Sequence, residues 1–298
     1  MRFAHIINPV KVKKDRDLYF AQPVTFETFK IAKNFSNIDV IQCSVQYEED
    51  RDIIPDHIKI LDNLSYSVLD KGDFKYKLPF IKEIFKIGYE NNIDADFLIY
   101  TDSDIALMPN FYLSIKNILE QGYDSIIVNR RDISDSKKEI KDIPYMYSQV
   151  GVKHSGWDCY IIKTSDYKKF NFEESIVGAV GDGEIIRANM IDNSKNFIEL
   201  KNEHLTFHLG ISPRLTGQYS DIDWVKLNLY NNGQAKIVIQ NIINNSNQKD
   251  LKWAEMRLDF LKNREKLYLD ALNDSNRFFG YWKLKKIYNF FSKHFRNS

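Results

Sequence analysis

Along residues 1–215, apolar positions follow two different periods in turn, which is typical of an α/β domain. Short apolar runs predict strands, whereas apolar residues three or four positions apart predict helices. Strands are expected at residues 3–7, 39–45, 66–69, 96–100, 125–129, 159–162 and 197–209. Helices are expected at residues 21–35, 77–91, 110–121 and 178–189. The continuous apolar centre of residues 96–100 indicates a strand buried on both faces.

The remainder of the chain has a different pattern. From residue 222 onward it is expected to be helical, with an interruption at the Asn-rich residues 241–248. Residues 130–145, by contrast, are polar and aperiodic, which predicts a mobile loop within the α/β part. We therefore expect an α/β domain over residues 1–215 and a helical region over residues 216–298.

The composition narrows the class of protein. The chain has 298 residues, of which 43% are hydrophobic and 28% charged, so it can bury a core and is not a disordered chain. Its formal net charge of +1 argues against a general nucleic-acid binder. Its apolar runs are too short to span a bilayer, and charge comes too early for a signal peptide, so a cytoplasmic protein is expected. Cys43 and Cys159 are too few for a disulfide framework.

Residues 277–298 form a separate basic segment with six Lys and Arg residues and no acid. Aromatic residues recur there at helical spacing, among them Tyr281, Tyr288 and Phe295. A basic, aromatic, amphipathic helix suits peripheral contact with an anionic inner membrane surface. The same stripe also suits packing on the rest of the chain, or on a second copy in a homo-oligomer, and this simpler interpretation is slightly favoured.

The sharpest chemical feature is an acidic motif, Asp102-Ser103-Asp104, directly after the buried strand at residues 96–100. Ligand crevices of parallel α/β sheets lie beyond the carboxyl ends of the strands. Two carboxylates there repel each other and favour a divalent cation such as magnesium or manganese, which can bridge a nucleotide diphosphate. The alternative is that the motif only caps a turn.

Three further motifs lie downstream. Gly156-Trp157 precedes a predicted strand, and the glycine-rich residues 178–184 place Asp182 and Glu184 at the start of a helix. Either acid is a candidate general base, although an acidic helix cap is the commoner structural role. His204 and His208 share one face if their segment is a strand, and one of them could be a third metal ligand.

In their order and spacing, these motifs resemble the GT-A fold of nucleotide-sugar-dependent glycosyltransferases, over roughly residues 3–210. No particular family is assigned. The resemblance implies an α/β, Rossmann-like nucleotide-binding mixed sheet flanked by helices, with a helical C-terminal extension. It implies that Asp102 and Asp104 hold Mn2+ or Mg2+ against the donor diphosphate, with Asp102 and Ser103 also near the nucleotide. It further implies His208, in preference to His204, as a metal ligand.

The resemblance also implies the remaining site residues. Asp182 or Glu184 would deprotonate the acceptor hydroxyl, and Trp157 would line the donor sugar, although Trp157 could equally be a buried aromatic anchor. Four residues lie where this fold contacts the base of the donor: Asn8, Pro9, Asp73 and Lys77. Lys77 could also be an ordinary residue in the first turn of a helix.

The expected function is a metal-dependent transfer of sugar from a nucleotide donor, a UDP-sugar being favoured, to a glycan or lipid-linked acceptor in surface polysaccharide synthesis. The segment Ile-Asn-Pro-Val at residues 7–10 and the acidic motif Gly-Asp-Gly-Glu depart from common members, so inversion is favoured only weakly over retention. A sugar-nucleotide nucleotidyltransferase is the first alternative, but its glycine-rich loop is missing at residues 8–11. A non-catalytic nucleotide- or glycan-binding protein is the second.

Overall fold

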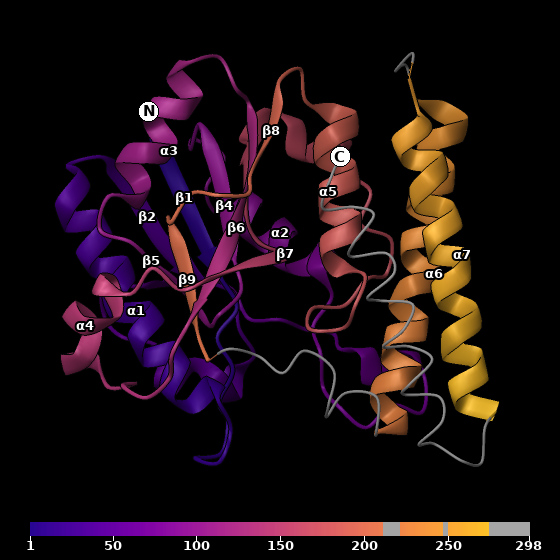
Figure 1. Cartoon of the computed structure of the whole chain (residues 1–298), viewed down its shortest axis with the longest axis horizontal. Helices are drawn as coiled ribbons and strands as arrows, with labels where there is room; N and C mark the ends of the chain where they lie inside the picture. The colour runs from indigo at the N-terminus through magenta and orange to yellow at the C-terminus, as the bar shows by residue number, and fades with distance from the viewer. Residues whose placement is uncertain (211–220, 247–249, 274–298) are drawn as a thin grey trace. The chain divides into compact units, whose positions relative to one another are not determined.

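The computed structural model describes residues 1–210, 221–246 and 250–273 (Figure 1). The chain divides into two compact units, each built from several segments. The sheet unit comprises Met1–Ser65, Lys82–Phe170 and Asn189–Ser212, and the helical unit comprises Tyr66–Ile81, Asn171–Ala188 and Pro213–Ser298. The sequence pattern led us to expect one boundary near residue 215, whereas two earlier segments also group with the C-terminal helices.

The sheet unit is built on a mixed sheet in the order β3-β2-β1-β4-β7-β6-β9-β5, with β8 pairing with β6. Its strands are β1 (Arg2–Ile7), β2 (Asp39–Ser44), β3 (Lys59–Ile60), β4 (Phe97–Thr101), β5 (Ile105–Leu107), β6 (Ser125–Ile133), β7 (Val152–Lys163), β8 (Phe197–Leu200) and β9 (Thr206–Leu209). Strands β3, β2, β1 and β4 are parallel, and β7 runs antiparallel to both β4 and β6. This arrangement confirms the expected α/β class with a mixed sheet.

Helices cover both faces of this sheet. The α-helices of the sheet unit are α1 (Leu18–Ser36), α2 (Ile81–Glu90), α3 (Phe111–Glu120) and α4 (Ile143–Ser148), and its 3-10 helices are η1 (Glu48–Ile53), η3 (Ile140–Asp142) and η4 (Thr164–Lys169). The 3-10 helix η2 (Val68–Lys71) lies in the helical unit, where α5 (Asp182–Asn193) begins. Successive side chains of β1 point to opposite faces of the sheet, so their contacts show which helices lie on each face. Phe3 clusters with residues of α1 and α3, whereas Ile6 contacts α2, where a Cβ on Gly88 would overlap the Ile6 side chain.

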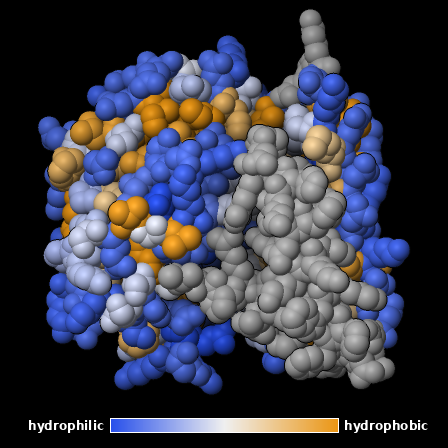
Figure 2. Space-filling model, in the orientation of Figure 1, coloured by the Kyte–Doolittle hydropathy of each residue, from blue (hydrophilic) through white to orange (hydrophobic). Residues whose placement is uncertain are grey.

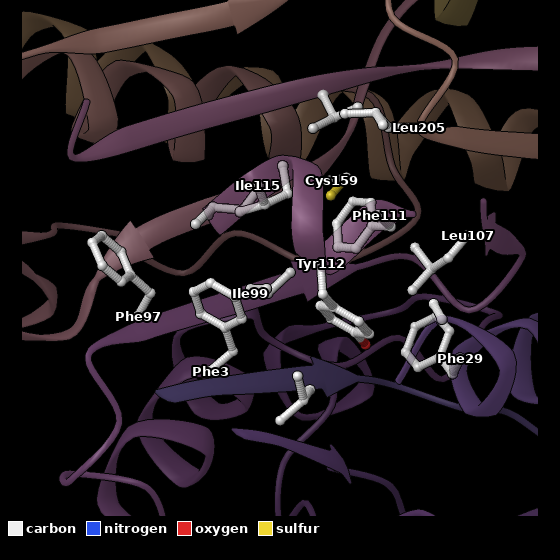
Figure 3. Close-up of a cluster of buried hydrophobic side chains, with 14 of the residues drawn as sticks. Phe3, Phe29, Phe97, Ile99, Leu107, Phe111, Tyr112, Ile115, Cys159 and Leu205 are labelled. Carbon is white, nitrogen blue, oxygen red and sulfur yellow. The ribbon is translucent and has the colours of Figure 1, made fainter. Parts of the chain in front are cut away.

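The main core lies between the sheet and the helices α1 and α3 (Figure 3). Phe29 from α1 and Phe111 and Tyr112 from α3 are fully buried against strand residues such as Phe3 and Ile99. Removing this apolar area from water supplies the main driving force for folding of the sheet unit. The same packing fixes the positions of β1 and β4. The carboxyl ends of these two strands carry the first candidate site residues.

The helical unit is organised by the paired helices α6 (Ile222–Asn245) and α7 (Lys252–Asn273). Its apolar cluster joins Leu227 of α6 to Val68, Phe80, Ile176 and Ala179. Residues 66–81 and 171–188 therefore belong with the C-terminal helices because their own apolar side chains are buried against α6.

Two predicted elements differ in the structure. Residues 66–69 do not form a strand: the Ser67 hydroxyl accepts a hydrogen bond from the Leu69 amide, and the Asp70 carboxylate accepts one from the Ser67 amide, which caps η2 instead. Residues 130–145 are not simply a loop, because β6 continues to Ile133 and α4 begins at Ile143. Pairing with β7 and β9 on its two sides extends β6 into this polar segment.

On the face drawn in Figure 2, hydrophilic residues cover most of the described surface, and apolar residues occur in separate small groups. Within the described ranges, none of the helices combines the length and the apolar character needed to cross a membrane. The basic segment at residues 277–298 lies outside the described residues.

Candidate functional site

The first part of the site follows from the register of two parallel strands. Ile7 of β1 pairs with Thr101 of β4, so the segments that begin at Asn8 and Asp102 leave the sheet at the same edge. The Asn8 side-chain amide donates a hydrogen bond of 2.7 Å to the carbonyl of Val45, just after β2. This is the edge at which ligands bind in open α/β sheets.

The second part comes from the short strands β5 and β9. Ile105 pairs with His208 in the antiparallel register, which brings the end of the acidic motif to the histidine. Nε2 of His208 lies 3.3 Å from Oδ2 of Asp104, and Nδ1 of His208 lies 3.1 Å from the carbonyl oxygen of Gly210. With the Nδ1 proton donated to Gly210, the Nε2 atom is the one presented to Asp104.

The two groups shift each other's pKa. Burial by itself raises the pKa of Asp104, but the hydrogen bond and charge of His208, with the charge of Arg130, hold it below its usual range. Burial lowers the pKa of His208, but the hydrogen bond and charge of Asp104 outweigh it and raise the pKa. Both shifts favour the ionised pair.

A second charged group, which the sequence analysis missed, lies beside this pair. The guanidinium of Arg130 donates to Asp132 Oδ1 at 2.9 Å and to Asp158 Oδ1 at 3.1 Å, and all three side chains are at most 12% exposed. Asp132 Oδ1 is also 3.8 Å from Nδ1 of His208. Burial raises the pKa of Asp158 although the Arg130 charge opposes this. Its Oδ2 accepts no hydrogen bond from the described residues, and Nδ1 of His154 lies 3.9 Å from it.

The acids and the histidine around Asp104 are the side chains here that could bind a divalent metal. Within residues 1–210, 221–246 and 250–273, no three or more His, Cys, Asp and Glu side chains converge as a metal site. Asp104 and His208 supply one carboxylate and one imidazole, which suit Mn2+. Asp132 and Asp158 are directed to Arg130 instead. The donor set therefore fits an ion that takes its other ligands from a phosphate or water.

The Gly-Trp motif lies on β7 next to an irregularity in its pairing with β6. The indole Nε1 of Trp157 donates a hydrogen bond of 2.8 Å to Oε1 of Glu199. At Gly156, a Cβ would lie 2.5 Å from the His154 ring, so a larger residue would require this ring to move. The hydrogen bond to Glu199 orients the indole of the partly buried Trp157. Ser103 is buried in the turn between β4 and β5.

His204 and His208 differ in position. Only His208 belongs to β9, because that strand begins at Thr206, and only His208 is paired with an acid of the Asp-Ser-Asp motif. The His204 ring packs edge-on against Phe207, and burial lowers its pKa. The alternation rule that placed both histidines on one face does not apply here, since residue 204 precedes the strand.

The remaining predicted residues belong to the helical unit. Asp182 begins α5, and its carboxylate accepts backbone hydrogen bonds from Gly178 at 3.2 Å and Gly183 at 2.6 Å. Glu184 is buried and accepts hydrogen bonds from Arg257 and Arg264 of α7. Burial raises the pKa of Glu184, but the two guanidinium charges outweigh it and hold the pKa below its usual range. Both its carboxylate oxygens are engaged, so Glu184 is a poor general base.

Asp73 and Lys77, two of the four residues expected near the donor base, are both exposed. They lie between η2 and α2, and α2 begins only at Ile81. Lys77 is therefore not a residue of the first helical turn, which was the alternative interpretation of its position.

No family model matches the chain, and no curated protein matches it. Among solved structures, TarS of S. aureus is similar with a TM-score of 0.48 and 11% identity, over 93% of this chain and 45% of TarS. A TarS fragment, residues 1–349, solved in complex with UDP-GlcNAc has a TM-score of 0.47 and 10% identity, over 93% and 75%. A 4-diphosphocytidyl-2C-methyl-D-erythritol synthase from Anaerococcus prevotii has a TM-score of 0.40 and 12% identity, over 77% and 97%.

The chain thus spans less than half of the length of TarS. At such identities the similarity concerns the fold alone and says nothing of the function of this chain.

Proposed function

We propose that the protein is a metal-dependent glycosyltransferase that moves a sugar from a nucleotide-diphosphate donor, a UDP-sugar, to a glycan or lipid-linked acceptor. The observation that carries the proposal is the pairing of Asp104 with His208 beside the carboxyl end of β4. Carboxylate and imidazole meet at the edge of the sheet where phosphate-bearing ligands bind in α/β folds.

A bound Mn2+ or Mg2+ would offset the negative charge that develops on the leaving diphosphate. In this proposal Asp104 and His208 hold the ion and Asp102 contacts the ion or the ribose. Asn8 and Pro9 border the base at the end of β1, with Ser103 nearby and with Asp73 and Lys77 as further donor contacts. Trp157, fixed by Glu199, lies against the donor sugar.

Asp182 is the proposed general base for the acceptor hydroxyl, in an inverting reaction. It is preferred to Glu184 because the carboxylate of Glu184 is neutralised by two arginines, whereas the carboxylate of Asp182 accepts hydrogen bonds from the backbone amides of Gly178 and Gly183. Surface polysaccharide synthesis at the cytoplasmic face of a membrane, through residues 277–298, is the setting in which such an enzyme would meet a lipid-linked acceptor.

The test is calorimetric titration of UDP into the protein with and without Mn2+. Manganese-dependent binding is expected, and Asp104→Ala and His208→Ala should each abolish the manganese dependence. Asp56→Asn is the matched control, because Asp56 is an exposed acid of the same unit. Equal UDP binding without metal and in Asp104→Ala would refute the metal site.

A donor screen then tests the transfer itself. Release of UDP from a UDP-sugar, dependent on an added acceptor and on Mn2+, is the expected result. If UDP does not bind, the same titration with GDP, CMP and dTDP decides whether another donor base is used. Release of pyrophosphate from a nucleoside triphosphate and a sugar phosphate would instead identify a nucleotidyltransferase.

A further inference from the structure

The glycine-rich segment Ile176–Glu184 carries Asp182, and polar side chains of α6 bind its backbone between Ile176 and Val180. Three buried asparagines of this helix, Asn228, Asn231 and Asn232, are each at most 1% exposed. Asparagine is unfavourable in helix interiors and is seldom fully buried, because its amide needs hydrogen-bond partners that the apolar core lacks. Three fully buried asparagines within two turns of one helix therefore indicate that their amides have specific hydrogen-bond partners.

Asn231 supplies the largest share of these bonds. Its Oδ1 accepts from the amide of Ile176 at 2.9 Å, and its Nδ2 donates to the carbonyls of Ile176 at 2.8 Å and of Ala179 at 2.9 Å. Asn228 Oδ1 accepts from the amide of Val180 at 2.9 Å. Two asparagine side chains thus take the place of the secondary-structure partners that this irregular backbone would otherwise lack.

The closeness of the segment to α6 is visible at Gly181. This residue has a φ of +126°, and a Cβ there would lie 3.2 Å from the backbone carbonyl carbon and oxygen of Asn231. A side chain would be both strained at this φ and too close to the helix. Glycine therefore lets the segment lie directly on the backbone of α6, one residue before Asp182.

The other end of the segment is held from α7. Arg257 and Arg264 bind the carboxylate of Glu184, and Arg264 Nε also donates to Oδ1 of Asn232 at 2.7 Å. Asn232 Nδ2 in turn donates to the carbonyl of Leu261 in α7 at 2.9 Å. Two polar groups thus hold the segment: Asn228 and Asn231 bind its backbone from α6, and Arg257 and Arg264, the latter bound to Asn232, hold Glu184 in the first turn of α5.

We propose that the α6–α7 pair is the element that positions the acidic segment for catalysis, with Asn231 and Asn228 as positioning residues for Asp182. The inference rests on the proposed function for its catalytic part. It explains why a helical extension accompanies the α/β part of the chain, since the extension supplies the side chains that fix the irregular backbone on both sides of Asp182.

The test compares Asn231→Ala and Asn228→Ala with Asn244→Ala, which changes an exposed asparagine of the same helix. Three properties are measured on the full chain: amide hydrogen exchange of residues 176–184, the affinity for UDP, and kcat and KM for the donor. In Asn231→Ala we expect faster exchange in the segment, UDP affinity within about twofold of wild type, and kcat lowered by up to about 100-fold, the cost of a small misplacement of a catalytic group.

Asn231→Asp keeps the acceptor for the Ile176 amide and loses the donor for the two carbonyls, so an intermediate loss of kcat is expected. Unchanged exchange in Asn231→Ala would overturn the inference whatever the activity. Faster exchange with unchanged kcat would show that the segment has no catalytic part to position, and would also overturn it. If the wild type transfers no sugar, the proposed function fails, and the exchange data alone decide whether α6 holds the segment.

Discussion

Nε2 of His208 lies 3.3 Å from Oδ2 of Asp104, and the two side chains are 12% and 26% exposed. One residue follows β4 and the other lies on β9, so the contact depends on the pairing of β5 with β9. Since each group shifts the pKa of the other toward the charged form, the pair makes the stability of the metal-free protein depend on pH.

The first prediction concerns this dependence. The raised pKa of His208 contributes stability that is complete below its ordinary value of 6.5 and is lost as the pH rises through the folded value. The lowered pKa of Asp104 contributes stability that is complete above its ordinary value of 3.8 and is lost on acidification. A double-mutant cycle with Asp104→Asn and His208→Gln, measured by urea unfolding in chelator, should give a coupling of about 1 kcal/mol near pH 5.5. The coupling should fall at pH 9.

An equal coupling at both pH values would mean that the charge of the imidazole does not change between them, and would contradict the prediction. His204→Gln is the control for the loss of an imidazole, because His204 has no acid of the Asp-Ser-Asp motif beside it.

The second prediction separates a structural from a catalytic role for Glu184. Glu184→Gln leaves Arg257 and Arg264 buried without their anion, which should lower the free energy of unfolding by about 3 kcal/mol. Glu255→Gln, an exposed change on α7, should stay within about 0.5 kcal/mol. Denaturant unfolding measures both. A Glu184→Gln protein of normal stability that has lost all transfer activity would contradict this and restore Glu184 as the base.

The strands and turn that carry Asp102 and Asp104 could be predicted because the apolar run and the acidic motif are adjacent in the sequence. The strand at residues 97–101 begins with a run of apolar residues and is buried on both faces, between β1 and β7 in the interior of the sheet. The acidic motif follows immediately, so the sheet edge fixes its place. His208 was preferred to His204 from its place beside Gly210, and the structure places His208 next to Asp104; its role as a metal ligand stays a prediction.

The charged group around Arg130 was not predictable, because its order comes from partners distant in the sequence. Arg130 and Asp132 lie in a polar stretch without period, yet β7 and β9 pair with it and Asp158 satisfies its buried guanidinium. The same holds for Glu184, whose arginine partners lie on α7. Periodicity reports burial of apolar faces and says nothing about such long-range charge pairs.

The third prediction uses two glycines of the helical unit that should respond in opposite directions. Gly181→Ala should lower the free energy of unfolding by about 1 kcal/mol or more, because its φ is +126° and its Cβ would crowd Asn231. Gly233→Ala should raise it by about 0.5–1 kcal/mol, since Gly233 lies inside α6 with open space around its Cβ position. Chemical denaturation checks both. A neutral Gly181→Ala would show that residue 181 does not lie against α6.

The fourth prediction concerns Trp157. If its ring lies against the donor sugar, Trp157→Ala should weaken binding of a UDP-sugar by roughly fivefold, about 1 kcal/mol of stacking, and leave binding of UDP unchanged. Glu199→Ala, which frees the indole from its hydrogen bond, should have a smaller effect in the same direction. Calorimetry with the two ligands separates the cases. Equal weakening of both ligands would assign Trp157 a structural role as an aromatic anchor.

The last prediction tests the charge balance around Arg130. Arg130→Met should lower the free energy of unfolding by about 3–5 kcal/mol at pH 8, because Asp132 and Asp158 are buried and lose the guanidinium that binds them both. Burial already raises the pKa of Asp158, and loss of the guanidinium should raise it further. A carboxyl whose folded pKa is raised destabilises the protein most at high pH, so the cost of Arg130→Met should shrink on acidification to pH 5.

Asp158→Asn added to Arg130→Met removes one of the two uncompensated charges and should recover part of the lost stability at pH 8. Arg51→Met is the control, because Arg51 is 43% exposed and its ion pair with Glu48 is at the surface. Urea unfolding at pH 5 and pH 8 gives the free energy of unfolding of the wild type and of these three variants. A cost of Arg130→Met that is the same at both pH values would mean that the two carboxylates find other partners, and that Arg130 does not balance their charge.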